Sequence, residues 1–173
     1  TAAFFVDSGL TYSGGATTTI SGLHHLIGQS VTILADGSTH PNKTVSSGQE
    51  TLDRSSTKVH IGLSYTALLQ TMRVELQGEG GTSQSKDKRI HEVTLRLHET
   101  VGVEVGPNLD NMERIPFRSS AAAMDTAVPL FTGDKQIEFR DDFNTDGFVF
   151  VRQTQPLPLT LLSAYPRITV NDG

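Results

Sequence analysis

The residues best suited to hold a metal ion lie in the segment DFNTDG, residues 142–147. Asp142, Asn144 and Asp146 place oxygen ligands at alternate positions, and a glycine that permits a sharp turn follows them, as in the first half of a calcium loop. The twelfth position of such a loop is Gln153, where a bidentate glutamate is needed. A turn rich in Asp and Asn that bonds its own backbone has the same sequence. The sequence therefore favours a plain turn, with calcium binding as the alternative.

The six histidines offer no metal-ligand spacing. His24 and His25 are adjacent, and adjacent side chains on a strand point to opposite faces. The others lie in separate segments, at His40, His60, His91 and His98. The chain contains no cysteine, which excludes disulfides, zinc ribbons, iron–sulfur clusters and thiol catalysis. We expect no metal site of this kind and no cofactor.

Motifs of catalysis are missing from the sequence as well. It contains no Gly-x-Ser-x-Gly elbow, no phosphate-binding Walker loop and no Gly-x-Gly-x-x-Gly. Carboxylates can be paired on paper at Asp141 with Asp142, but glycosidases also need aromatic side chains that stack on sugar, and the chain has no Trp and only three Tyr. We expect that the protein is not an enzyme.

Length and composition indicate a turn-rich β protein. The chain has 173 residues, the size of one domain, and 36% hydrophobic residues with 16 Gly and 7 Pro. Its formal net charge of -5 does not favour binding to nucleic-acid phosphates. No stretch of about 20 apolar residues predicts a membrane span. Because the chain begins with Thr1, we expect it to be a piece of a longer protein.

Alternation of apolar and polar residues predicts strands along the whole chain. In residues 90–100, Val93, Leu95 and Leu97 should face a core while the residues between them face water. Two Asp-Gly pairs, at 36–37 and 146–147, predict hairpin turns. Residues 63–76 fit a helix or strands, and the β-rich surroundings favour strands.

The C-terminal residues 160–164 and 167–170 predict two further strands on either side of Pro166. Residues 78–88 are glycine-rich and contain no apolar side chain, which predicts an exposed, mobile loop. Residues 108–128 form a second long irregular stretch. We therefore expect an all-β fold, an antiparallel sandwich or barrel-like single domain over residues 1–173 with long irregular loops.

Four stretches resemble a known family: SGLHHLIGQSVTILADGSTHPNKTV, VHIGLSYTALLQTMRVE, VPLFTGDKQIEF and QPLPLTLLSAYPRITV. Together they resemble the C-terminal region of the tail tubular, or nozzle, virion proteins of short-tailed phages, over nearly the whole chain. The resemblance implies a structural protein of the virion tail that has no catalytic residues. It also implies a ring of copies, expected to be a hexamer, that joins an adaptor protein and conducts DNA during ejection without binding it specifically.

An acidic channel wall would repel DNA phosphates, so we expect some acidic residues to face the channel or its mouth. The candidates are Glu75, Glu79, Asp87, Glu92, Asp141 and Asp142. The alternative is that these acids only solvate the outer surface. The competing function is a non-catalytic β-sandwich binding module on a phage tail or capsid, which contacts a host glycan or a neighbouring virion protein.

Overall fold

The computed structural model describes residues 4–78, 81–119, 123 and 126–171. Its regular structure is β-strand throughout, apart from one 3-10 turn at His24–Leu26, and all paired strands are antiparallel. The expected all-β antiparallel class is confirmed. The sheets of the described residues stay open, and no closed barrel forms from them.

The chain forms two compact units, where the sequence led us to expect one domain. Unit 1 contains Thr1–Thr66, Phe117–Pro129 and Thr154–Pro158. Unit 2 contains Ala67–Pro116, Leu130–Gln153 and Leu159–Gly173. The division is hidden in the sequence because no Pro- or Gly-rich linker marks residue 66, and two later segments return to unit 1.

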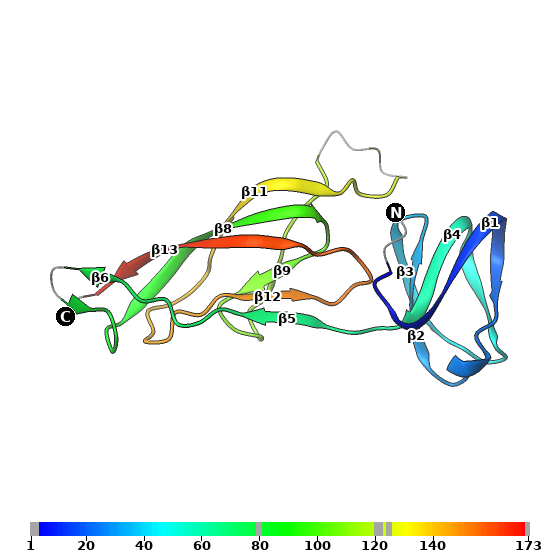
Figure 1. The fold of residues 1–173 in the computed structure, drawn as a ribbon, viewed down its shortest axis with the longest axis horizontal. Helices are drawn as coiled ribbons and strands as arrows, with labels where there is room; N and C mark the ends of the chain where they lie inside the picture. Colours follow the sequence, from blue (N-terminus) through cyan, green and yellow to red (C-terminus); the bar gives the residue numbers. More distant parts are fainter. Residues whose placement is uncertain (1–3, 79–80, 120–122, 124–125, 172–173) are drawn as a thin grey trace. The chain divides into compact units, whose positions relative to one another are not determined.

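Unit 1 is built on a four-stranded sheet with the strand order β1-β4-β2-β3 (Figure 1). Its strands are β1 (Asp7–Ser21), β2 (Ser30–Ala35), β3 (Ser38–Thr44) and β4 (Gln49–Leu63). Asp36 and Gly37 connect β2 to β3 with φ angles of 49° and 78°, and Ala35 pairs with Ser38. Positive φ at both central residues is what a two-residue hairpin turn requires, so the hairpin predicted at residues 36–37 is confirmed.

The carboxylate of Asp36 ties this turn to β4. It accepts hydrogen bonds from the backbone N–H and the hydroxyl of Thr57, and from the N–H of Lys58 at 2.9 Å. Desolvation raises the pKa of Asp36, but the hydrogen bonds outweigh it and the net pKa is lowered. One apolar cluster lies beneath the sheet: Ile20, Leu23, Leu26, Val31, Ile33, Ala35, Val45, Leu52, Val59 and Ile61.

Unit 2 contains two larger sheets and one short hairpin (Figure 1). The first sheet, in the order β10-β9-β12-β5, consists of β5 (Ala67–Gln70), β9 (Glu104–Gly106), β10 (Glu113–Arg114) and β12 (Phe150–Gln153). The second, in the order β11-β8-β13, consists of β8 (Lys88–Thr100), β11 (Phe131–Glu138) and β13 (Leu161–Val170). The hairpin pairs β6 (Gln77–Gly78) with β7 (Gly81–Thr82). Two antiparallel sheets around buried apolar side chains make unit 2 sandwich-like.

The central strand β8 follows the predicted alternation. Val93, Leu95 and Leu97 are fully buried, whereas Arg96 and His98 are exposed. Residues 63–76 form no helix, and strand β5 runs through them, as the favoured interpretation predicted.

Three local predictions were wrong. Asp146 and Gly147 do not close a hairpin, since β12 pairs with β5 and β9 and no strand ends at Asp146. Residues 161–170 form one strand with register shifts in place of two strands, because Pro166 lies on a sheet edge where its missing N–H breaks no ladder bond.

Residues 78–88 are not one exposed loop. Ser83 is 4% exposed, and Lys88 begins β8 with only 1% of its surface accessible. The mobility of this segment stays a prediction, and residues 79–80 lie outside the described part of the chain.

Candidate functional site

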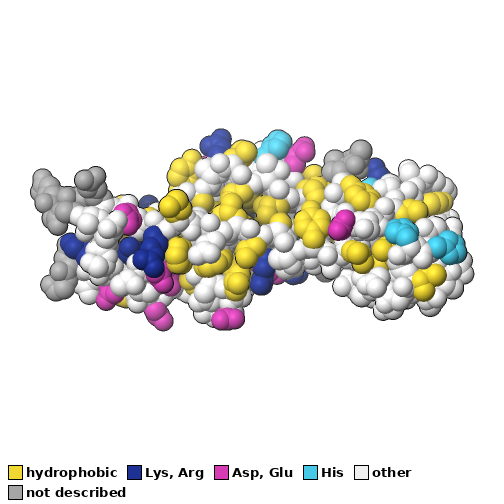
Figure 2. Space-filling model, turned by 60° about the horizontal axis from the view of Figure 1, so that its bottom comes forward, with side chains coloured by type: hydrophobic (Ala, Val, Ile, Leu, Met, Phe, Trp, Pro, Cys, Tyr) yellow, Lys and Arg dark blue, Asp and Glu magenta, His cyan; other side chains and the backbone are white. Residues whose placement is uncertain are grey.

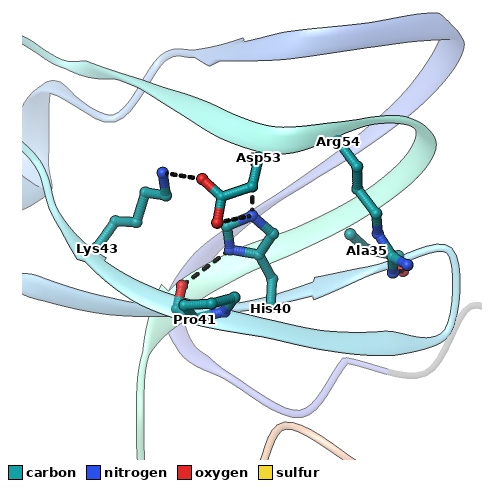
Figure 3. Close-up of polar contacts among 6 residues, drawn as sticks. All are labelled: Ala35, His40, Pro41, Lys43, Asp53 and Arg54. Carbon is teal, nitrogen blue, oxygen red and sulfur yellow. Dashed lines mark hydrogen bonds and ion pairs between the residues drawn. The ribbon is translucent and has the colours of Figure 1, made fainter.

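A buried histidine, His40, lies at the centre of a polar cluster in unit 1 (Figure 3). His40 lies on β3, and its side chain, 3% exposed, reaches β4, a strand that is not its neighbour in the sheet. His40 Nε2 accepts a hydrogen bond from the backbone N–H of Asp53 at 2.9 Å, and Nδ1 lies 2.9 Å from the carbonyl oxygen of Pro41. The imidazole therefore occupies the place that a paired strand would take beside this part of β4.

These two contacts fix the tautomer of His40. A ring nitrogen that accepts a hydrogen bond carries no proton, so the proton lies on Nδ1, which donates it to Pro41. Both nitrogens of the neutral ring are then in use. His40 offers no free lone pair for a metal ion or for proton abstraction, although a buried histidine beside an aspartate has the composition of a catalytic pair.

Two cations surround this histidine without contacting its ring. Lys43 Nζ donates to Asp53 Oδ1 at 2.6 Å, and the Arg54 guanidinium donates to the carbonyl oxygen of Ala35 at 2.8 Å. The hydrogen bond from Lys43 is the main cause that lowers the pKa of Asp53. Together these contacts clamp the first half of β4 to the β2–β3 hairpin, so the cluster holds the fold of unit 1 together.

His60 is the second buried histidine of unit 1. Its Nδ1 lies 2.8 Å from the Thr11 hydroxyl, and the ring of Phe4 meets it edge-on at 5.7 Å between centroids. Desolvation, with the nearby charge of Lys58 second, lowers the pKa of His60 below its ordinary value of 6.5. The structure thus keeps His60 neutral at physiological pH.

The other histidines do not converge. His24 and His25 lie in the 3-10 turn, not on a strand, and His25 Nε2 contacts the carbonyl oxygen of Ser8 at 2.7 Å. His91 and His98 are exposed in unit 2. In the described part of the chain no group of three or more His, Asp or Glu is placed to hold a metal ion.

The calcium candidate folds as a turn that satisfies itself. Asn144 Oδ1, the atom that would bind calcium, accepts the N–H groups of Asp146 at 2.9 Å and Gly147 at 2.8 Å. The carboxylate of Asp146 pairs with Arg73 at 2.7 Å. Asp142 is exposed and contributes its carbonyl oxygen, which accepts the Asn144 side-chain amide at 3.0 Å. The three predicted ligands therefore direct their oxygens to different partners.

The backbone of this turn is joined to the start of β8. Lys88 N–H donates to Asn144 O at 2.8 Å, and Asn144 N–H donates back to Lys88 O at 2.9 Å. The buried ammonium of Lys88 donates to the carbonyl oxygen of Val74 at 3.3 Å. The fixed position of the 142–147 turn follows from these contacts without a bound ion.

The predicted channel acids are scattered over unit 2. Glu75 accepts from Gln84 at 2.9 Å, and Glu92 pairs with Arg167 at 3.5 Å. Asp87 and Asp142 are exposed. Glu79 lies outside the described residues.

Asp141 differs from these acids because it is only 9% exposed. Burial raises its pKa, although the side-chain amide of Asn144 donates to it at 3.1 Å. It exposes little of its side chain at the surface of unit 2, and its place in a channel wall stays a prediction.

A cavity of about 340 Å³ in unit 2 was not found from the sequence. It lies between the end of β11 and the β9–β10 connection, and its apolar wall includes Val105, Met112 and Phe139. Glu113, Glu138 and Arg140 supply its charges. No motif joins these residues, which come from segments about 25 positions apart, so no signal in the sequence pointed to the cavity.

The chain matches no protein-family model and no curated protein. In the described residues there is no helix with the length and apolar character needed to cross a membrane.

Proposed function

We propose that this chain is a non-catalytic structural subunit of a phage virion, part of a short tail tube or nozzle ring through which DNA passes. The proposal rests on the resemblance of residues 4–170 to tail tubular proteins. The exposed apolar and acidic side chains of unit 2 support it. The polar clusters support it as well, because their hydrogen-bond donors and acceptors contact other parts of the fold.

The observation that carries the proposal is a run of exposed apolar side chains along β5 and the residues after it, with Leu68 and Leu69 on opposite faces of the strand. Leu68, Leu69, Met72 and Leu76 are 49%, 44%, 88% and 47% exposed, within nine residues of one another. Hydrophobic side chains gather on the face of unit 2 that comes forward in Figure 2, the side on which β5 lies in Figure 1. A cluster of large exposed apolar side chains on a sheet edge is typical of a surface that another chain covers.

The acids at the surface fit a role beside DNA. Glu75, Asp87 and Asp142 are exposed on the same unit, and the chain carries a net charge of -5. A wall of this sign repels phosphates, which lets DNA slide without being held. We expect Glu75→Lys with Asp87→Lys to slow DNA ejection, and the matched reversal Glu50→Lys in unit 1 to leave it unchanged.

The experiment that tests the proposal is immunogold electron microscopy of the native particles with antibodies raised against this chain. Label around the tail would support the tube function. Label on the capsid surface or on lateral fibres would overturn it and favour the binding-module alternative.

A further inference from the structure

The inference concerns the free edge of β11 in unit 2. Among the described residues β11 pairs with β8 alone, and its register is regular from residue 133 to residue 138. Sheet edges that are not meant to be paired usually carry a proline, a bulge or a very short strand. Over these six residues the β11 edge has none of these three, and the protecting feature it does carry is the charge of Asp134, Lys135 and Glu138.

The register shows which backbone groups point outward. Phe139 N–H donates to His91 O at 2.9 Å, and Ile137 lies opposite Val93. Because bonded pairs alternate along an antiparallel ladder, residues 133, 135 and 137 bond to β8, while the N–H and C=O groups of Asp134, Gln136 and Glu138 point away from it. Three outward donors and three outward acceptors thus line the free edge.

The opposite edge of the same sheet is protected. The backbone N–H and C=O of Val93 point to β11, so Val93 makes no ladder bond with Pro166, the residue opposite it on β13. The nitrogen of Pro166 therefore faces the outer edge of the sheet. This edge therefore lacks a donor at its centre, and β13 also has register shifts at 161/163 and 167/168. The contrast singles out β11 as the edge of this sheet open to pairing.

The inner face of β11 is incompletely covered. Phe131 and Ile137 are only half-buried, whereas their neighbours Val93 and Leu95 on β8 are fully buried. The other sheet ends on this side with β10, which has two residues. An added strand beside β11 would direct its inward side chains into this opening.

The cavity at the end of β11 defines the side chain that fits there. Its lining residues include the apolar Val105, Met112 and Phe139 and the charged Glu113, Glu138 and Arg140, whose formal charges sum to one negative unit. Among the described residues no ion pair joins Arg140 to Glu113 or Glu138. A long cationic side chain combines an apolar stem with a charged head, which matches these walls and carboxylates.

We propose that the β11 edge binds an extended peptide segment of a partner protein by strand addition, with a lysine or arginine of that segment in the cavity beside Glu113 and Glu138. In this mode the backbone bonds supply affinity and the pocket supplies specificity. The proposal holds whether or not the chain belongs to a phage tail, because it depends on unit 2 alone.

The probe is the capped peptide Ac-Thr-Val-Thr-Arg-Thr-Val-Thr-NH2, titrated into the full chain and followed by amide NMR. In the free chain, the amides of Asp134, Gln136 and Glu138 should exchange with solvent much faster than those of residues 135 and 137. Peptide binding should shift and protect these three amides. The same peptide N-methylated at alternate residues should not bind, because its edge cannot pair.

Two charge variants of the cavity should change the affinity for the peptide in opposite directions. Glu138→Gln should weaken binding of the arginine peptide about fivefold, and Arg140→Gln should strengthen it by a similar factor. Replacing the peptide arginine with norleucine, which keeps the stem, should remove both effects. A merely structural role of these residues would move both variants in the same direction.

Three outcomes would overturn the proposal. One is the absence of shifts at residues 134–138 at millimolar peptide. Another is equal binding of a peptide with glutamate in place of arginine. The third is protection of the three edge amides in the free chain together with a dimer in solution, which would assign the edge to a second copy.

Discussion

Replacing His40 with alanine should destabilise unit 1 through the backbone of Asp53. The substitution removes the acceptor of the Asp53 N–H and the donor to Pro41 O, each in a 2.9 Å contact, at a side chain that is 3% exposed. A buried donor left without an acceptor costs about 1–3 kcal/mol. The free energy of unfolding should fall by about this amount in urea denaturation.

Hydrogen exchange gives a local measure of the same effect. The Asp53 amide should exchange roughly 5- to 150-fold faster in His40→Ala, since ~1.4 kcal/mol corresponds to a factor of ten. Asp53→Asn is the matched control, because it keeps the backbone N–H and removes only the exposed carboxylate, whose side chain is 58% accessible. His98→Ala controls for loss of an exposed histidine.

The comparison of the two substitutions decides the mechanism. If the backbone bond is what matters, Asp53→Asn costs clearly less than His40→Ala, and the Asp53 amide stays protected. If Asp53→Asn costs as much or more, the stability comes from the contacts of the Asp53 carboxylate with Lys43 at 2.6 Å and with His40 Nε2 at 3.4 Å, and the role assigned to the backbone bond is wrong.

Three further predictions follow from the structure. Because the folded-state pKa of His60 lies below 6.5, the unfolded chain binds the proton more readily than the native state. The free energy of unfolding should therefore fall as the pH drops below about 6.5, by up to ~1.4 kcal/mol per pH unit. Urea unfolding at pH 7.5 and 5.5 measures this difference, and His60→Asn should remove it. Burial raises the pKa of Asp141, so the native state holds the proton more tightly than the unfolded chain does, and the contribution of Asp141 to stability should decline as the pH rises above about 4. Asp141→Asn should therefore be at least as stable as the natural chain at pH 7 in thermal unfolding, and a lower melting temperature would contradict this. Leu95→Ala removes a fully buried side chain from the central strand of unit 2 and should cost about 2–5 kcal/mol in urea unfolding, whereas Leu162→Ala, at a side chain 59% exposed, should cost far less.

Local sequence rules predicted the features that depend on neighbouring residues. Asp36 and Gly37 tolerate positive φ, which is sufficient to define the β2–β3 hairpin. The alternation around Val93, Leu95 and Leu97 defines both the strand and its buried face. The all-β class follows from such signals repeated along the chain.

Features that depend on distant residues were not predictable in this way. Lys88 looks like a loop residue beside Lys86 and Asp87, yet its burial results from the 142–147 turn that bonds its backbone. The sequence predicts a strand break at Pro166, because it does not show that this residue lies on a sheet edge, where proline is tolerated.

The same limit applies to the candidate sites. His40 and Asp53 lie 13 positions apart with no motif between them, and their contact exists because β3 and β4 approach each other outside the ladder. The Asp142–Asp146 pattern was visible, and its two interpretations differ only in where Asn144 Oδ1 points. Glu113 and Glu138 belong to no motif, so the cavity between them emerges only from the fold.

The position of β8 at the centre of its sheet has a consequence for synthesis on the ribosome. Both of its partners, β11 and β13, come later in the chain, and β13 begins 61 residues after β8 ends (161 − 100). At about 5–20 residues per second, a nascent chain displays Val93, Leu95 and Leu97 on a strand with at least one edge unpaired for roughly 3–12 s before β13 is made. Until then these side chains form a short, strongly apolar β segment, the kind that chaperones bind and that aggregates between neighbouring polysomes. Glu92 and Arg96, the charged residues that alternate with them on β8, thus act as gatekeepers during translation as well as surface groups of the finished sheet.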